Sequence, residues 1–127
     1  MSTERLLAPL FSLAISILLV ASAQLVIKAR LANYGPMPAS SEILDYLGKV
    51  IMDPLLWLAG FLLLAAAGLW YFGLSRVPLT TAVYFAALIY PIITIASYLY
   101  LGEGLSFLKL LGMALIAGGV VLTIAAG

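Results

Sequence analysis

Gln24 and Lys28 stand four positions apart near the end of the first long apolar segment of this 127-residue chain. Positions i and i+4 share one face of a helix, so the amide and the ammonium would point the same way. Polar groups inside a membrane span usually need a partner or a watery cavity. An amide beside a cation would suit an anionic group, such as a phosphate, that enters from the membrane interface.

The same row of positions continues toward the N-terminus through Ser16 and Ser12. Because the row drifts by about 40° every four residues, it would form a slanting track of small polar groups that ends in a cation. In the alternative interpretation, Lys28 and Arg30 extend to the lipid headgroups and Gln24 binds a neighbouring helix. The residues alone leave both interpretations open.

Tyr84 and Tyr90 lie within the third apolar segment, and Pro91 follows directly. A proline inside a helix frees a backbone carbonyl and favours a kink. A kinked, tyrosine-bearing helix could line a path for a polar group, although simple packing is as common. Glu103, between two glycines, could bind a cation or could be a solvated turn residue.

Small residues recur on one stripe of the fourth apolar segment. Gly112 and Gly119 are seven residues apart on this stripe, where small residues let a second helix approach closely, and Leu115 and Gly118 complete the predicted interface. This stripe predicts either a dimer seam or packing within the same chain.

The composition is that of a membrane protein, with 65% hydrophobic and 9% charged residues, whereas a soluble domain has about 25% charged residues. The chain contains no cysteine and no histidine, which excludes thiol and imidazole catalysis and nearly every zinc site. A net charge of +1 without a basic cluster argues against nucleic acid. We therefore expect no catalytic residues, no metal, no cofactor and no enzyme activity.

Four segments are long enough to cross a bilayer, which takes about 20 apolar residues. They are Leu6–Leu31, Pro54–Leu74, Leu79–Leu101 and Leu105–Ala126. The sequence thus predicts an all-α membrane protein with four transmembrane helices, forming a single domain over residues 1–127. Short turns after the second and third segments would make neighbouring spans antiparallel.

The first loop is longer and contains a segment, Ile43–Met52, with apolar residues at positions 43, 44, 47, 50 and 51. This helical spacing predicts a short amphipathic helix, which would lie on the membrane surface or pack on the spans. Alternating spans place more Lys and Arg on the side of this loop than on the N-terminal side. The distribution favours an N-terminus outside the cytoplasm but does not decide it.

Four spans in so short a chain resemble the small multidrug resistance family and its relatives in the drug/metabolite transporter superfamily. The residues Gly112-x-x-Leu115-Ile116-x-x-Gly119-Val120 are similar to that family's dimerisation motif, and Val77-Pro78-Leu79-Thr80-Thr81-Ala82 is similar to the start of its third span. The drug exporters carry a glutamate in the first span, and this chain has no acid there.

Instead, Ala23-Gln24-x-x-x-Lys28-Ala29 resembles the Gly-Gln-x-x-x-Lys pattern of the relatives that flip lipid-linked aminoarabinose. Leu101-Gly-Glu103-Gly-Leu-Ser106 resembles the Glu-x-x-Ser turn before their last span. The resemblance implies a flippase, or a flippase subunit, that moves a monosaccharide on a polyprenyl phosphate, such as undecaprenyl phosphate, across the bacterial inner membrane. It also implies a homodimer or a heterodimer with a similar subunit.

We therefore expect substrate-binding roles for Gln24, Lys28, Arg30, Tyr84, Tyr90 and Glu103. Lys28, with Arg30, would hold the phosphate, and Gln24 would hydrogen-bond the phosphate or the sugar. Glu103 would meet an amino group on the sugar, and the tyrosines would line the path. Two alternatives are a proton-coupled exporter of small cations and a non-transporting membrane partner of a glycosyltransferase.

Overall fold

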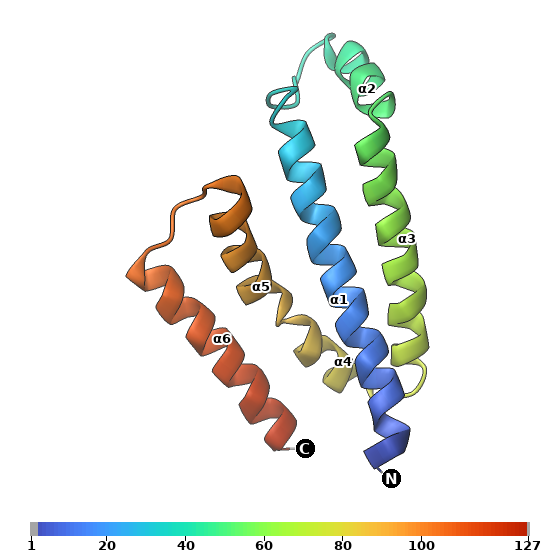
Figure 1. Ribbon diagram of the computed structural model, residues 1–127, viewed down its shortest axis with the longest axis vertical. Helices are drawn as coiled ribbons and strands as arrows, with labels where there is room; N and C mark the ends of the chain where they lie inside the picture. The colour runs from blue at the N-terminus through green and yellow to red at the C-terminus, as the bar shows by residue number, and fades with distance from the viewer. Residues whose placement is uncertain (1–2, 127) are drawn as a thin grey trace.

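Helices make up the computed structural model, which describes residues 3–126 and holds no β-strand within them (Figure 1). In chain order they are α1 (Thr3–Leu31), α2 (Ile43–Ile51), α3 (Pro54–Leu74), α4 (Leu79–Ala86), α5 (Ile89–Ala96), the π-helix η1 (Ser97–Leu101) and α6 (Phe107–Ala125).

The four predicted spans are present as helices long and apolar enough to cross a membrane: Leu7–Leu31, Pro54–Leu74, Leu79–Leu101 and Phe107–Ala125. The chain is therefore an all-α, multi-pass membrane protein. Local signals set the helix starts. The Asp53 carboxylate accepts a hydrogen bond from the Leu55 amide before α3, and the Ser106 hydroxyl accepts one from the Lys109 amide before α6. Such capping satisfies backbone donors that the first turn leaves free.

The third span is broken in the way that Pro91 predicts, but the break lies N-terminal to the proline. Helix α4 ends at Ala86, and α5 begins at Ile89. Pro91 has no N–H to donate to the carbonyl of Ala87, four residues earlier, and its ring crowds that carbonyl. The amide of Tyr90 donates to the Ala87 carbonyl instead, at 3.2 Å, in a tighter turn.

Helices α1 and α3 pack side by side along most of their length (Figure 1). Two serines of α1 donate hydrogen bonds across this interface, Ser12 to the Leu69 carbonyl at 2.6 Å and Ser16 to the Ala66 carbonyl at 2.8 Å. Near the end of α3, Gly73 faces the fully buried Leu13 of α1 at a distance that leaves no room for a side chain.

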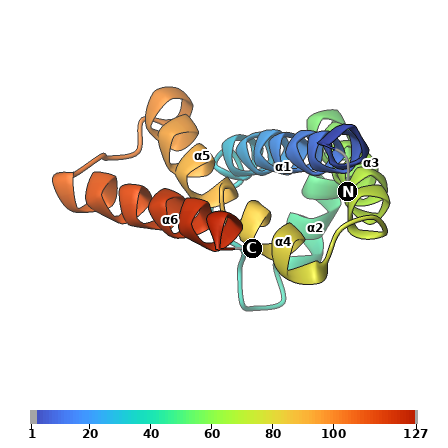
Figure 2. The same ribbon diagram turned by 90° about the horizontal axis from the view of Figure 1, so that it is seen from below.

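The remaining spans form a looser second group. Helix α5 contacts α1 on one side and α6 on the other, and α6 also contacts α4. Figures 1 and 2 show α6 leaning away from the α1–α3 pair, with the connection from η1 to α6 extended. Most of the α6 surface is exposed in the single chain; Val120 is the buried residue of this helix.

The predicted amphipathic helix is α2, which lies between the end of α1 and the start of α3 (Figure 1). Its Tyr46 is buried and donates a hydrogen bond to the Gly35 carbonyl at 3.2 Å. Its apolar side chains Leu44 and Ile51 are mostly exposed. They do not pack on the spans, which favours the membrane-surface alternative.

Candidate functional site

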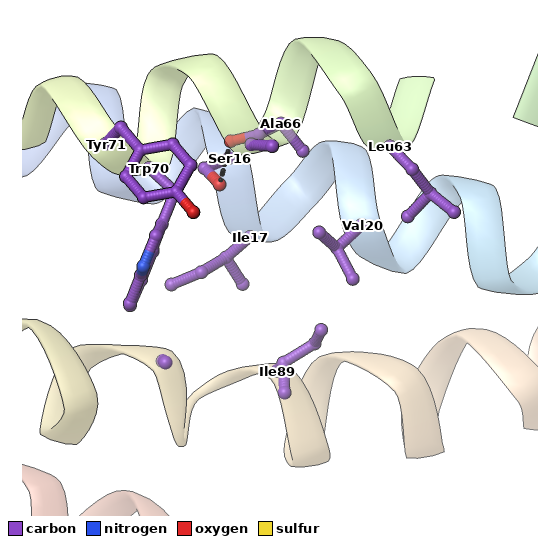
Figure 3. Close-up of a pocket in the computed structure, with 10 residues that line it drawn as sticks. Ser16, Ile17, Val20, Leu63, Ala66, Trp70, Tyr71 and Ile89 are labelled. Carbon is purple, nitrogen blue, oxygen red and sulfur yellow. Dashed lines mark hydrogen bonds between the residues drawn. The ribbon is translucent and has the colours of Figure 1, made fainter. Parts of the chain in front are cut away.

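Gln24 and Lys28 are both exposed on α1, on the flank that faces the third span. Gln24 follows Ile17 by seven residues, and Lys28 follows Ile17 by eleven. Each spacing rotates the side chain by only about 20° from the direction of Ile17. Ile17 and Val20 face Ile89 of α5 (Figure 3). The amide and the ammonium therefore continue the same flank toward the membrane interface.

Below this polar pair, a groove of about 370 Å³ runs between α1, α3 and α5 (Figure 3). Its lining is almost entirely apolar: Ser16, Ile17, Val20, Leu63, Ala66, Ala67, Trp70, Tyr71, Ala86 and Ile89. Ser16 contributes no free hydroxyl, because that group is bonded to the Ala66 carbonyl. The rise of 1.5 Å per residue places Gln24 about 6 Å and Lys28 about 12 Å beyond Val20 along the axis.

Ser12 and Ser16, the N-terminal part of the predicted polar track, are buried at the α1–α3 interface. Their hydroxyls bond α3 carbonyls, so they contribute to helix packing and not to a polar path. The i, i+4 spacing correctly indicates a shared face for each neighbouring pair. Over three turns, however, the row drifts by more than 100°, from the α3 side of α1 to the α5 side.

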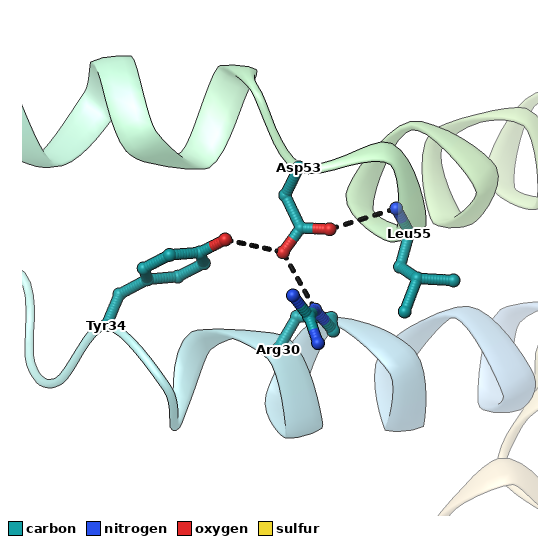
Figure 4. A network of polar contacts seen from close by, with 4 residues as sticks. All are labelled: Arg30, Tyr34, Asp53 and Leu55. Carbon is teal, nitrogen blue, oxygen red and sulfur yellow. Dashed lines mark hydrogen bonds and ion pairs between the residues drawn. The ribbon is translucent and has the colours of Figure 1, made fainter.

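Arg30 lies on the opposite flank of α1 from Lys28, because two residues correspond to about 200° of rotation. Its Nε donates to the Oδ2 atom of Asp53 at 2.7 Å, forming an ion pair (Figure 4). The Tyr34 hydroxyl donates to the same oxygen at 2.6 Å, and the Leu55 amide donates to Oδ1 at 2.9 Å. Lys28 and Arg30, expected to hold one phosphate together, thus lie on separate flanks of α1.

The Asp53 side chain is completely buried, so these three donors define its electrostatics. The Tyr34 hydroxyl, together with the Arg30 ion pair and the Leu55 amide, lowers the pKa of Asp53 below 3.8 despite the opposing effect of burial. The hydrogen bond to the Asp53 carboxylate, with burial, raises the pKa of Tyr34 above 10.0. Asp53 therefore stays ionised and Tyr34 stays protonated over a wide pH range. Together with Arg30 they connect the end of α1 to the start of α3.

Tyr84 and Tyr90 are exposed on α4 and α5, and neither lines the groove between α1, α3 and α5. The aromatic residues that do line it are Trp70 and Tyr71 of α3, which were not among the predicted site residues. A usable signal was the run of small residues shortly before them, residues 65–68, because small side chains leave space beside a helix.

Glu103 lies in the loop after η1 and lines a second groove, of about 290 Å³, between α5 and α6. Lys109 lines the same groove and donates from Nζ to the Gly104 carbonyl at 2.7 Å. Gly112 also belongs to this lining. Glu103 and Gly112, predicted for separate roles, are thus brought together with a lysine that was not predicted.

The predicted seam of α6 is open in the single chain. Leu115 is 69% exposed, and a Cβ added at Gly112, Gly118 or Gly119 would meet no atom within 4 Å. The chain itself therefore does not use this stripe for close helix packing, and the dimer seam stays a prediction.

No family model matches the chain, and no solved structure matches it. A curated protein of Sodalis glossinidius (strain morsitans), the probable 4-amino-4-deoxy-L-arabinose-phosphoundecaprenol flippase subunit ArnF, is 32% identical over 111 residues. The match covers 84% of this chain and 83% of that protein. A likeness of this extent, in a chain with four membrane-spanning helices, shows that the chain belongs to the ArnF family of flippase subunits.

Proposed function

We propose that this chain is a subunit of a flippase that moves a polyprenyl-phosphate-linked monosaccharide across the bacterial inner membrane. The observation that carries the proposal is the layout of one flank of α1. An apolar groove between α1, α3 and α5 is followed, about 6 to 12 Å nearer the interface, by an amide and an ammonium. A polyprenyl phosphate has the same order of parts, with an apolar chain attached to an anionic head.

In this proposal Lys28 attracts the phosphate by charge, and Gln24 donates a hydrogen bond to the phosphate or the sugar. The apolar groove, with Trp70 at its end opposite Lys28, takes part of the polyprenyl chain. At the Lys28 site Arg30 acts as a positioning residue, because it lies on the other flank of α1 and its Nε binds the buried Asp53. Glu103, exposed beside Lys109, meets an amino group of the sugar.

Tyr84 and Tyr90 keep a proposed role only in an assembly of two chains. Both are exposed on the broken third span, so a second subunit could enclose them together with the open groove. The exposed stripe of Gly112, Leu115, Gly118 and Gly119 supplies a surface for that pairing, with the same chain or with a similar subunit.

The test is translocation of a lipid-linked amino sugar in proteoliposomes, measured as the accessibility of its amine to a membrane-impermeant reagent. The chain is reconstituted alone and with a second subunit from the same source. Removing one charge-assisted contact to phosphate predicts a rate at least about tenfold lower for Lys28→Ala. Lys28→Arg should retain most of the rate because it retains the cation.

Arg76→Ala is the matched control, since it also removes a cation. Arg76 lies in the turn between α3 and α4, at the other end of α1 from Lys28, and its Cζ is 4.7 Å from the centroid of the Phe72 ring. Equal rates for wild type and Lys28→Ala would remove Lys28 from the mechanism.

Resistance to cationic drugs in a sensitised host would favour the exporter alternative, although no span carries the carboxylate that proton exchange requires. Co-purification with a glycosyltransferase, without any flipping, would favour the non-transporting alternative.

A further inference from the structure

Another groove, with charged residues in its lining, lies between α2, the end of α1 and the start of α3. It is on the other flank of α1 from Lys28. It has a volume of about 680 Å³, and its lining includes Arg30, Tyr34, Asp45, Lys49 and Asp53. A neighbouring groove of about 410 Å³ shares three of these residues, Tyr34, Asp45 and Lys49. The two grooves therefore form one continuous polar surface, which we call the α2 groove.

The floor of the α2 groove is fixed by the network of Arg30, Tyr34 and Asp53 (Figure 4). Because the Asp53 carboxylate is fully buried and receives three hydrogen bonds, its charge is satisfied internally. The Arg30 ion pair uses Nε, while a guanidinium carries further N–H donors on its two terminal nitrogens. The floor is thus rigid, and it is nearly neutral because the charges of Arg30 and Asp53 cancel. The terminal nitrogens of Arg30 still have N–H groups that can donate to a ligand.

Beside Arg30, the wall of the α2 groove carries one free charge of each sign, and Glu42 adds a second carboxylate in the neighbouring part of the groove. Asp45 and Lys49 are exposed on α2, four residues apart on one helix face. In the part of the chain that the structure describes, the salt bridge found is Arg30–Asp53, so Asp45 and Lys49 do not pair with each other. A ligand that satisfies both must itself carry an anion and a cation.

The position of the α2 groove limits the ligand to the membrane interface. Helix α1 ends at Leu31 and α3 begins at Pro54, so both spans leave the membrane at this level. Leu44 and Met52, which are 75% and 81% exposed, form an apolar rim of the same groove. A charged wall beside an apolar rim fits a lipid headgroup with its chains alongside α2.

We propose that the α2 groove binds a lipid headgroup that carries both a phosphodiester and a primary ammonium. The phosphodiester binds the Lys49 ammonium and the free N–H donors of Arg30, and the ligand ammonium binds the Asp45 carboxylate. Two lipids share this chemistry: an amino sugar linked to a polyprenyl phosphate, and phosphatidylethanolamine. The groove does not involve Lys28, so it would serve as a separate capture site for a lipid in the leaflet.

The test measures binding of lipids to the purified chain in detergent, using phosphatidylethanolamine and phosphatidylglycerol with identical acyl chains. Both have a phosphodiester, and only the first has an ammonium. Wild type should bind phosphatidylethanolamine about 1.4- to fivefold more tightly, which is the range for an exposed ion pair. Asp45→Asn should reduce this ratio to about one, and Lys49→Gln should weaken binding of both lipids.

Glu4→Gln, in the first turn of α1, and Arg76→Gln remove the same charges at the opposite end of the spans and should leave the ratio unchanged. A second pair, polyprenyl phosphate with and without an amino sugar, identifies the occupant. If the amino-sugar lipid displaces phosphatidylethanolamine and loses its advantage in Asp45→Asn, the groove captures the flippase substrate. If the amino-sugar lipid does not displace phosphatidylethanolamine, the occupant of the groove is phosphatidylethanolamine.

Equal binding of phosphatidylethanolamine and phosphatidylglycerol by wild type, or an unchanged ratio in Asp45→Asn, would overturn the proposal. Both side chains are exposed on α2, so their substitution leaves the packed interior intact. The result is separate from the test of flipping, because Lys28 lies on the other flank of α1. A flippase that fails without Lys28 but binds both lipids equally would retain its proposed function and lose only this site.

Discussion

The contact of Gly73 with α1 gives the sharpest test of how helices α1 and α3 are held together. A Cβ built on Gly73 would lie 2.6 Å from both Cδ2 and Cγ of Leu13 and 3.0 Å from the backbone oxygen of Pro9. Carbon atoms in good contact are about 3.5–4.0 Å apart, so a methyl group would overlap Leu13 by about 1 Å. Leu13 is fully buried, and the Pro9 oxygen belongs to the backbone.

Gly73→Ala must therefore push α1 and α3 apart or force Leu13 from its preferred rotamer. Overpacking of this kind costs about 1–3 kcal/mol. Alanine also favours a helix over glycine by about 1 kcal/mol, which offsets part of that cost. Gly68→Ala on the same helix carries the same propensity gain, and its Cβ would meet nothing within 4 Å. The difference between the two variants thus isolates the packing cost, and we expect Gly73→Ala to be less stable by about 1–3 kcal/mol.

The assay is unfolding of both variants in mixed micelles with increasing dodecyl sulfate, followed by circular dichroism. The flipping rate, measured in parallel, should fall in Gly73→Ala, because a shift of α1 against α3 deforms the groove below Lys28. Equal stabilities for Gly73→Ala and Gly68→Ala would refute the close approach of the two helices at this point.

Three further changes probe other contacts. Because the pKa of Asp53 is lowered in the folded chain, its ionised carboxylate stabilises the fold at pH values above 3.8. This stabilisation is lost as the pH falls further and the carboxylate is protonated. Asp53→Asn should lower the melting temperature at neutral pH and remove this acid-dependent loss, and an unchanged pH profile would contradict the network. Ser16→Ala should cost about 0.6 kcal/mol in the same micelle assay, the average for an interhelical hydrogen bond in a membrane. Pro91→Ala restores an amide donor at the broken turn, so that amide should become protected from hydrogen exchange; rapid exchange would show that the break has another cause.

The sequence by itself determined the spans and the points where they start, end and bend. Hydropathy over about 20 residues, the prolines, and caps such as Asp53 and Ser106 act within one or two turns of the chain, so they can be read from neighbouring residues. Even the break at Ala87 follows from Pro91, four residues away, once the proline's effect on the carbonyl of the preceding turn is considered.

Tertiary structure decided which side chains are free. Lys28 and Arg30 look equivalent in the sequence, but Arg30 meets Asp53, 23 residues later, and Lys28 remains exposed. The sequence likewise favoured Tyr90 for lining a path, whereas the packing of α3 on α1 places Trp70 in the groove. Helical periodicity fixes the direction of a side chain relative to its own helix only. Which neighbour lies in that direction depends on how distant helices pack, and that information is spread over the whole chain.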